Sequence, residues 1–303
     1  MKKILIITGI IIFTLIGCNN KPENEENSIV VTNYPAKMII KEIVSNSIKV
    51  ESLLRPGDSP HTYSPKPSDA SKTENAKLFV YIADNLDSWV TKYDNPNKIE
   101  LIKLVPKGNL IYFSDAHQHE NDDDEIAHEG HSHNDGAADP HFWLDPLTVK
   151  AILPSLQTEI IKAFPEKKNL IENNIQLFSK KLDNIHNTIE KELKKVKGKY
   201  VFTFHPSFEY FIKRYGLISG GSLEVVPGKE PSPNYIKHLS DLIKLTKTKT
   251  IFSEPQFPKK TAESIAAMTN TKLEVLDPIG GVKNIITYYD LLFFNTRVLK
   301  KSL

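Results

Sequence analysis

The sequence predicts an α/β protein of two lobes with mainly parallel sheets, joined by one long rigid helix. Short apolar segments typical of strands alternate with helical patterns between residues 28 and 105, and the alternation returns after residue 200. Between them, a helical pattern of roughly 30 residues would span about 45 Å, the length of a domain. We therefore expect a first lobe at 28–165, a connecting helix at 166–198 and a second lobe at 199–303.

The elements of the first lobe follow from its alternation of apolar runs and turn residues. The run from Ile29 to Val31 favours a buried strand that ends before Tyr34. The expected strands lie at residues 28–33, 48–54, 78–82 and 98–105. The expected helices lie at residues 36–44, from 67 onward, and at 86–93. After the second strand, the turn-rich residues 55–60 present His61.

Helical patterns dominate from residue 146 to 196, and the alternation then resumes. Helices are expected at 146–163 and 166–196, and the apolar positions of the second are Leu170, Leu177, Phe178, Leu182, Ile185, Ile189, Leu193 and Val196. The strands expected in the second lobe lie at 200–204, 223–226, 250–253 and 273–276. The helices expected there lie at 208–215, 234–246, 260–268 and 283–300. Polar residues follow several of these strands, at the carboxyl ends where open α/β sheets place ligands.

The N-terminus has the pattern of a secretory signal. Two lysines precede an apolar run from Ile4 to Ile16, which is shorter than the roughly 20 residues that span a bilayer. The sequence Leu-Ile-Gly-Cys ending at Cys18 resembles the lipobox of bacterial lipoproteins. We expect residues 1–17 to be a signal peptide, Cys18 to be lipid-modified, and residues 18–27 to be a polar tether. The alternative is a plain signal peptide in which this cysteine has no role.

Composition excludes several classes of protein. Hydrophobic content of 40% and charged content of 25% are typical of a soluble globular chain, and 303 residues suffice for two ordinary cores. Cys18 is the only cysteine, so neither an intrachain disulfide nor a thiolate metal site is possible in the folded body. Without residues 1–17 the chain has 37 basic and 37 acidic residues, which gives no support to nucleic-acid binding.

A segment rich in histidine and acid occupies residues 115–139. It contains nine carboxylates, no Lys or Arg, and five histidines: His117, His119, His128, His131 and His133. Such tracts are typical of metal binding, and this one has too little apolar surface to form a core. We expect an acidic loop that attracts metal ions. The alternative is a solvated linker whose histidines have no function.

Four other side chains stand out by their positions: His61, His141, His205 and Asp277. Each lies at a strand or loop end, beside proline or aromatic residues that restrict the backbone. Three imidazoles and a carboxylate form a donor set suited to zinc. The alternative for each histidine taken singly is a hydrogen-bonded structural role.

The segments around these residues resemble a known family. They are Pro60–Asp69, Asp139–Pro146, Phe204–Phe211 and Ser253–Phe257. They are similar to the signature segments of the metal-binding lipoproteins of ABC importers, the ZnuA-like group (cluster A-I, or cluster 9), and the resemblance extends from residue 28 to the C-terminus. It implies a metal site in the cleft between two α/β lobes, with His61 and His141 from the first lobe and His205 and Asp277 from the second.

The same resemblance implies zinc as the metal. Zinc carriers of the group have a histidine at position 205, whereas manganese carriers have a carboxylate, which agrees with the preference of imidazole for zinc. Asp277 or a water would complete the ligand shell. Glu254 is expected to orient a ligating histidine, with direct coordination as the alternative.

The expected function is that of an extracytoplasmic binding protein, anchored to the bacterial cell membrane through Cys18, and not that of an enzyme. It would capture Zn²⁺ and deliver it, as a monomer, to the permease of an ABC importer. Three alternatives remain: a manganese-binding member of the group, a secreted adhesin, and a zinc hydrolase with Glu254 as general base. The last lacks both a His-Glu-x-x-His helix and a serine elbow.

Deletion of residues 115–135 tests the role of the histidine-rich loop. We expect the deletion to lower the number of zinc ions bound per chain while one tight site remains, because the loop would hold further ions weakly. Isothermal titration calorimetry measures both quantities. Unchanged stoichiometry, together with unchanged uptake at scarce zinc, would show that the loop is a linker.

Overall fold

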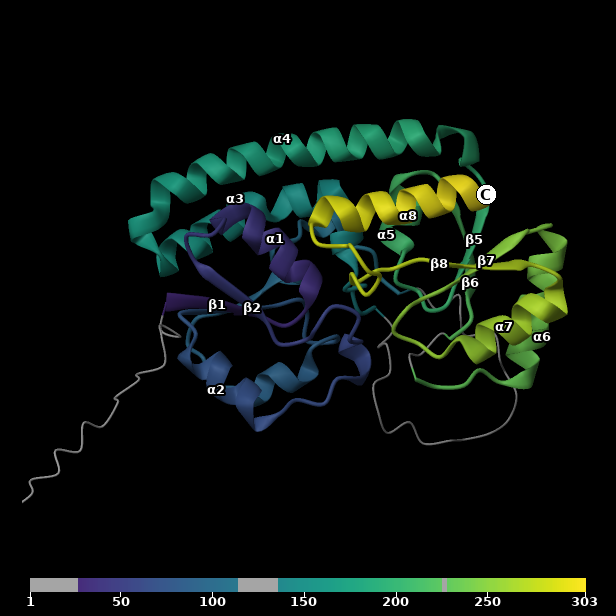
Figure 1. The fold of residues 1–303 in the computed structure, drawn as a ribbon, viewed down its shortest axis with the longest axis horizontal. Coiled ribbons are helices and arrows are strands. Elements are labelled where there is room, and N and C mark those ends of the chain that lie inside the picture. Colours follow the sequence, from purple (N-terminus) through teal and green to yellow (C-terminus); the bar gives the residue numbers. More distant parts are fainter. Residues whose placement is uncertain (1–26, 114–135, 225–227) are drawn as a thin grey trace, which may run out of the picture.

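The computed structural model describes residues 27–113, 136–224 and 228–303 of the chain. It is an α/β protein with parallel sheets and one long helix, α4, that runs along one side of the molecule (Figure 1). Among the described helices, none combines the length and the apolar character needed to cross a membrane.

The N-terminal half, residues 27–165, contains a four-stranded sheet in the order β2-β1-β3-β4, with all pairs parallel. Its strands are β1 (Ser28–Val31), β2 (Lys49–Ser52), β3 (Leu78–Tyr81) and β4 (Lys98–Glu100). Its α-helices are α1 (Tyr34–Val44), α2 (Pro67–Asn75) and α3 (Pro146–Ala163). The order places β1 between β2 and β3, so the loops after these strands leave from one edge of the sheet.

The C-terminal half, residues 199–303, contains two pairs of parallel strands. One pair is β5 (Tyr200–Thr203) with β6 (Ile218–Ser222), and the other is β7 (Thr250–Ser253) with β8 (Lys272–Val275). The α-helices are α5 (Glu209–Arg214), α6 (Pro233–Leu245), α7 (Lys259–Thr269) and α8 (Tyr288–Ser302). The last helix, α8, lies beside α4 and contacts α4, α1 and β8, and its C-terminal end lies over the strands of this half (Figure 1).

The long helix is α4 (Lys168–Leu193), whose 26 residues span about 39 Å. It is flanked by 3₁₀ turns at Pro165–Lys167 and Lys194–Val196, so the expected limits of 166–196 are close to the observed ones. A single apolar core beneath it includes side chains from α1, α3, α8 and both halves of the molecule. The helix is therefore bound along its length and does not act as a free hinge.

The buried face of α4 differs from the expected one at its start. Leu170 and Leu177 are exposed, the latter by 57%, whereas Ile171 and Ile175 are buried. The predicted apolar face includes every leucine of this helix. The buried face instead follows positions 171, 175, 178 and 182, which keep the three- and four-residue spacing. Leu170 and Leu177 lie one position off this face.

Several short elements also differ from expectation. Residues 86–93 contain a 3₁₀ helix, Ser88–Lys92, and β4 has only three residues before a 3₁₀ helix begins at Leu101. Strand β6 (Ile218–Ser222) lies before the expected segment 223–226. It was not predicted because Gly220 and Gly221 interrupt its apolar pattern. Helix α8 begins late, since Thr287 and Asp290 form a capping box there.

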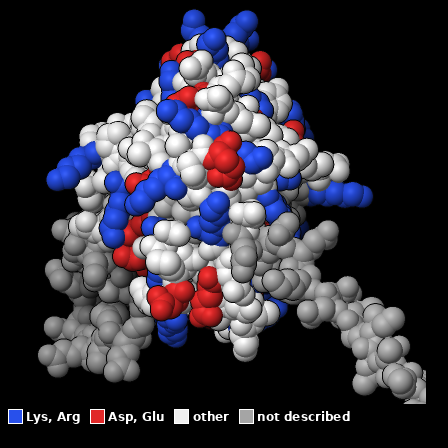
Figure 2. All heavy atoms as spheres, turned by 90° about the vertical axis from the view of Figure 1, so that its left-hand side faces the viewer, with Lys and Arg blue, Asp and Glu red and all other residues white. Residues whose placement is uncertain are grey.

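The end of the molecule where α3 turns into α4 carries exposed charges of both signs (Figure 2). Two ion pairs lie in this region: Lys77 with Glu166 at 4.0 Å, and Lys168 with Glu172 at 3.9 Å. Such exposed pairs contribute at most about 1 kcal/mol each. The stability of this end therefore comes from the apolar core between the two helices.

A buried carboxylate ties together the carboxyl ends of β1 and β3. Asp87 is fully buried, and its Oδ2 accepts hydrogen bonds from Thr32 Oγ1 at 3.0 Å and from the Ile82 N–H at 2.8 Å. Its Oδ1 has no hydrogen-bond partner among the described residues. Burial raises the pKa of the Asp87 carboxyl to about 7, although these hydrogen bonds oppose the change.

Asp87 predicts how stability depends on pH. The folded chain retains the Asp87 proton at a pH where the unfolded chain has lost it, so the free energy of unfolding should fall as pH rises from about 4 to about 7. The cost above pH 7 is at most about 4 kcal/mol. Asp87→Asn keeps an acceptor for Thr32 and Ile82 but cannot ionise, so it should flatten this dependence in urea unfolding between pH 5 and pH 8. The exposed Asp94→Asn serves as control, and parallel curves for wild type and Asp87→Asn would contradict the assignment.

Candidate metal centre

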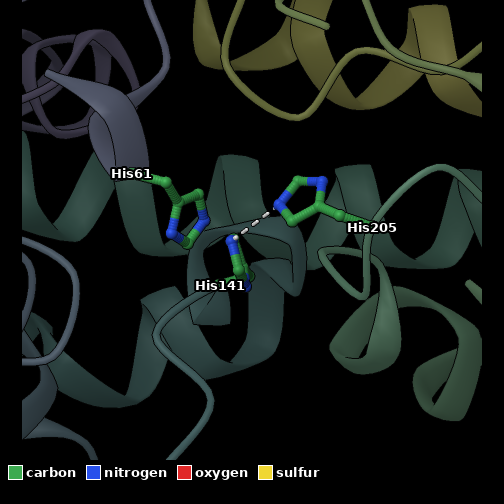
Figure 3. Close-up of side chains that lie close together, drawn as sticks. All are labelled: His61, His141 and His205. Atoms are coloured by element: carbon green, nitrogen blue, oxygen red, sulfur yellow. Dashed lines mark hydrogen bonds between the residues drawn. The ribbon is translucent and has the colours of Figure 1, made fainter. Parts of the chain in front are cut away.

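Three histidines from distant parts of the sequence face a common centre (Figure 3). One ligand nitrogen from each of His61, His141 and His205 lies within 4.8 Å of the other two. The centroids of their rings are 5.2 to 5.6 Å apart. His141 and His205 are buried, and His61 is partly exposed.

His61 is carried by the loop that follows β2. The start of this loop is fixed to the end of β1, since the Leu53 N–H donates to Val31 O at 2.9 Å. The next N–H, of Leu54, donates to Thr32 O at 3.0 Å. His61 itself lies in the 3₁₀ turn Pro60–Thr62, which begins with a proline whose fixed φ suits a helical start.

The His61 loop contacts the C-terminal half where two glycines meet. Gly57 has a φ of +86°, and a β-carbon placed on it would lie 3.0 Å from Gly281 Cα. A β-carbon on Gly281 would lie 2.8 Å from Gly57 Cα. Any side chain at either position would therefore push the two backbones apart.

His141 directly precedes the 3₁₀ helix Phe142–Leu144. Asp139 Oδ1 accepts hydrogen bonds from both the backbone N–H of His141, at 2.9 Å, and its Nδ1, at 2.7 Å. Asp139 is fully buried, and the ring of Trp143 packs against the imidazole with centroids 5.2 Å apart. The imidazole is thus fixed on two sides, and its Nε2 is directed to the centre.

His205 follows β5 and is held in the same manner by Glu254, which follows β7. Glu254 Oε1 lies 2.7 Å from His205 Nδ1 and also accepts from Ser207 Oγ at 3.3 Å. Its Oε2 accepts from Gln256 Nε2 at 2.5 Å. Glu254 is 1% exposed, so the structure gives this carboxylate an orienting contact with His205. Phe257 packs on the same imidazole.

The spacing of the two buried histidines matches that of zinc ligands. A carboxylate on Nδ1 fixes the tautomer in which Nε2 presents its lone pair. His141 Nε2 and His205 Nε2 are 3.4 Å apart. Two nitrogens at about 2.05 Å from a tetrahedral zinc lie about 3.3 Å from each other. This pair therefore has the geometry of one edge of a zinc tetrahedron.

The structure does not bring Asp277 into this group. Its Oδ1 accepts from the N–H groups of Ile279 and Gly280, at 3.0 and 2.8 Å, and its Oδ2 accepts from that of Val282 at 2.6 Å. Asp277 is fully buried, and these three hydrogen bonds fix the loop that meets Gly57. To reach a metal ion it would have to give up backbone hydrogen bonds, each worth about 1 to 3 kcal/mol.

Two acidic residues near the centre did not stand out in the sequence. Asp139 is the Nδ1 partner of His141, and the Asp-Pro-His spacing is the signal for it. Glu224, after β6, is buried, and its Oε2 accepts from the Gly228 N–H at 3.1 Å. Burial raises the pKa of the Glu224 carboxyl, although the hydrogen bond from Gly228 and the nearby His205 oppose the change. A residue this far from any histidine in sequence gives no signal of its own.

Other expected functional residues lie outside the described part of the chain. They are the lipidation site Cys18 and the loop histidines His117, His119, His128, His131 and His133.

Comparison with known proteins places the chain in a family. The family model described as "ZnuA: Zinc-uptake complex component A periplasmic" matches residues 29–302. The chain belongs to this family. The residues matched include all three clustered histidines and both carboxylates bonded to them.

Relatives of this family share sequence and fold with the chain. It is 27% identical over 310 residues to the zinc-binding lipoprotein AdcA of Streptococcus pneumoniae (strain R6), a match that covers 100% of this chain but only 61% of that relative. It is 29% identical over 292 residues to the high-affinity zinc uptake system protein ZnuA of Brucella abortus (strain 2308), covering 87% of each. A mutant structure of the laminin-binding adhesin Lmb of Streptococcus agalactiae aligns with a TM-score of 0.77 at 26% identity, covering 91% of this chain and 99% of that one.

The contact between Glu254 and His205 yields a prediction for zinc affinity. Glu254→Gln removes the negative charge that holds the Nδ1 hydrogen, so zinc binding should weaken about 10- to 100-fold. Competition with a chromophoric chelator measures the change. The exposed Glu230→Gln removes one charge on the same half of the molecule and should leave affinity unchanged. Equal affinities for the two variants would show that Glu254 does not act on the imidazole.

Proposed function

We propose that the chain is an extracytoplasmic protein that captures Zn²⁺ and delivers it to the permease of an ABC importer. The zinc is cargo. The observation that supports this most is the convergence of His61, His141 and His205, with two of their nitrogens 3.4 Å apart. Family membership and the names of the relatives from S. pneumoniae and B. abortus support the same function.

We propose His61, His141 and His205 as the zinc ligands, with Asp139 and Glu254 orienting two of them. Because Asp277 Oδ1 and Oδ2 accept three backbone hydrogen bonds, a water is the simpler fourth ligand, and Asp277 remains the alternative. Three imidazoles favour zinc over manganese, which prefers oxygen ligands. The metal would reach the His-rich residues 115–139 first and the histidine trio afterwards.

A hydrolytic role gains little support from this site. A general base must have a free oxygen within reach of the attacking water. Glu254 is buried, and its two oxygens contact His205, Ser207 and Gln256. We therefore propose that Glu254 orients a ligand and that the protein is not an enzyme.

We propose that residues 1–17 are a signal peptide and that a lipid on Cys18 anchors the protein outside the membrane through the tether 18–27. Residues 28–165 and 199–303 would act as two lobes joined by 166–198, in a monomer. An adhesin role is a second candidate, because the S. agalactiae structure with a similar fold is of a laminin-binding adhesin. Loss of host-surface binding with intact zinc uptake would separate the two roles.

Metal content and the His205→Glu variant test the proposed function. We expect protein purified without added metal to contain about one tightly bound zinc, measured by elemental analysis. Replacing an imidazole by a carboxylate should weaken zinc at least about tenfold and shift preference towards manganese. The exposed His238→Glu adds the same charge on α6 and should bind zinc as the wild type does. A wild-type chain that prefers manganese would overturn the zinc assignment.

A further inference from the structure

The segment that carries His141 precedes α3 in the N-terminal half, yet helix α5 of the C-terminal half holds it at both ends. Tyr210 donates its hydroxyl hydrogen to Asp139 O at 3.0 Å, two residues before the histidine. Arg214 donates from Nε and Nη2 to the Asp145 carboxylate at 2.6 to 2.9 Å, four residues after it. Both partners on the segment are buried.

Each of these contacts is strong for a physical reason. The guanidinium of Arg214 uses two nitrogens on one carboxylate, which fixes orientation as well as distance. Asp145 also caps α3 by accepting from the Leu147 N–H and from Thr148 Oγ1, so the arginine is bound to a carboxylate that cannot move freely. The Tyr210 hydroxyl further accepts from the Ile111 N–H at 3.1 Å.

Two more hydrogen bonds attach the middle of the segment to the C-terminal half. Trp143 donates its indole N–H to Pro278 O at 2.8 Å, and the Tyr288 hydroxyl donates to Trp143 O at 2.6 Å. Trp143 and Tyr288 are both buried. The His141 segment is therefore bound to the C-terminal half at its start, its middle and its end.

Helix α5 begins only four residues after His205, so the residues that hold the segment are covalently close to the second ligand. His61 is different, because its loop starts from hydrogen bonds to the end of β1. Two of the three imidazoles are thus held by hydrogen bonds to one framework, whereas the loop of the third meets that framework through the backbone contact of Gly57 with Gly281.

We propose that Tyr210 and Arg214 are positioning residues that keep His141 and His205 at zinc-ligand spacing before the metal arrives, and that His61 completes the site afterwards. This inference rests on the proposed zinc binding. The ion first binds to His141 and His205, whose side chains do not have to rearrange. The free-energy cost of ordering the ligands is therefore smaller. The loop of His61 then supplies the third nitrogen.

Zinc affinity of the full chain tests the proposal through Tyr210→Phe. The variant loses one hydroxyl and should bind zinc about tenfold more weakly, measured by competition with a chelator. Tyr215→Phe is the matched control, because this hydroxyl is buried in the same region and has no hydrogen-bond partner among the described residues. It should leave affinity within about twofold. Equal zinc affinities for Tyr210→Phe and the wild type would overturn the proposal.

Double variants separate positioning from a general loss of stability. Tyr210→Phe should weaken zinc less in a His141→Ala background than in the wild type, because the imidazole that it positions is gone. In a His61→Ala background its effect should be fully additive. The same coupling in both backgrounds, or in neither, would overturn the proposal.

Arg214→Lys provides the second variant, since lysine keeps the charge but not the paired contact. It should also weaken zinc and couple to His141→Ala, whereas Lys213→Ala, at the exposed neighbouring position, should do neither. An Arg214→Lys variant without coupling would overturn the role of the arginine. A wild-type chain that does not bind zinc would overturn the proposed function and this inference with it.

Discussion

The hydrogen bonds from Nδ1 of His141 to Asp139 and from Nδ1 of His205 to Glu254 are the constraint on which this centre depends. Each fixes one imidazole in the tautomer and the orientation that turn Nε2 inward. The two buried carboxylates also bring two negative charges to a place where a dication would bring two positive ones. An ion pair in a buried site is favourable only when its remaining polar atoms are hydrogen-bonded, and the contacts of Glu254 with Ser207 and Gln256 meet this condition for one of the two.

The fold brings the partners of the hydrogen bond between His205 and Glu254 together, because it places the ends of their strands side by side. His205 and Glu254 follow β5 and β7, two neighbouring strands of the C-terminal half, so the Glu254 carboxylate reaches the His205 ring without a long loop. His61 follows β2 at the corresponding edge of the other sheet. Helices α4 and α8 close the core over both halves, which keeps these edges facing each other.

Much of this arrangement could be predicted from the sequence, and the failures have physical causes. The three histidines were recognisable because proline and aromatic neighbours restrict their backbones. Asp277 has the same signal, since it precedes a proline at a strand end; in the structure its carboxylate accepts hydrogen bonds from its own loop, so its role as a ligand stays a prediction. Sequence position could not distinguish these roles, because both place a carboxylate at a strand end. Tyr210 and Arg214 gave no signal, because their partners lie about 70 residues away in the chain.

The contact of Gly57 with Gly281 has a consequence for the ion that the trio accepts. Backbone meets backbone there, so the His61 loop can approach no further once the two α-carbons touch. This steric contact limits how closely the His61 imidazole can approach those of His141 and His205. If the trio holds the ion as proposed, this limit would exclude an ion whose bonds to the three nitrogens are shorter than the Gly57–Gly281 contact allows.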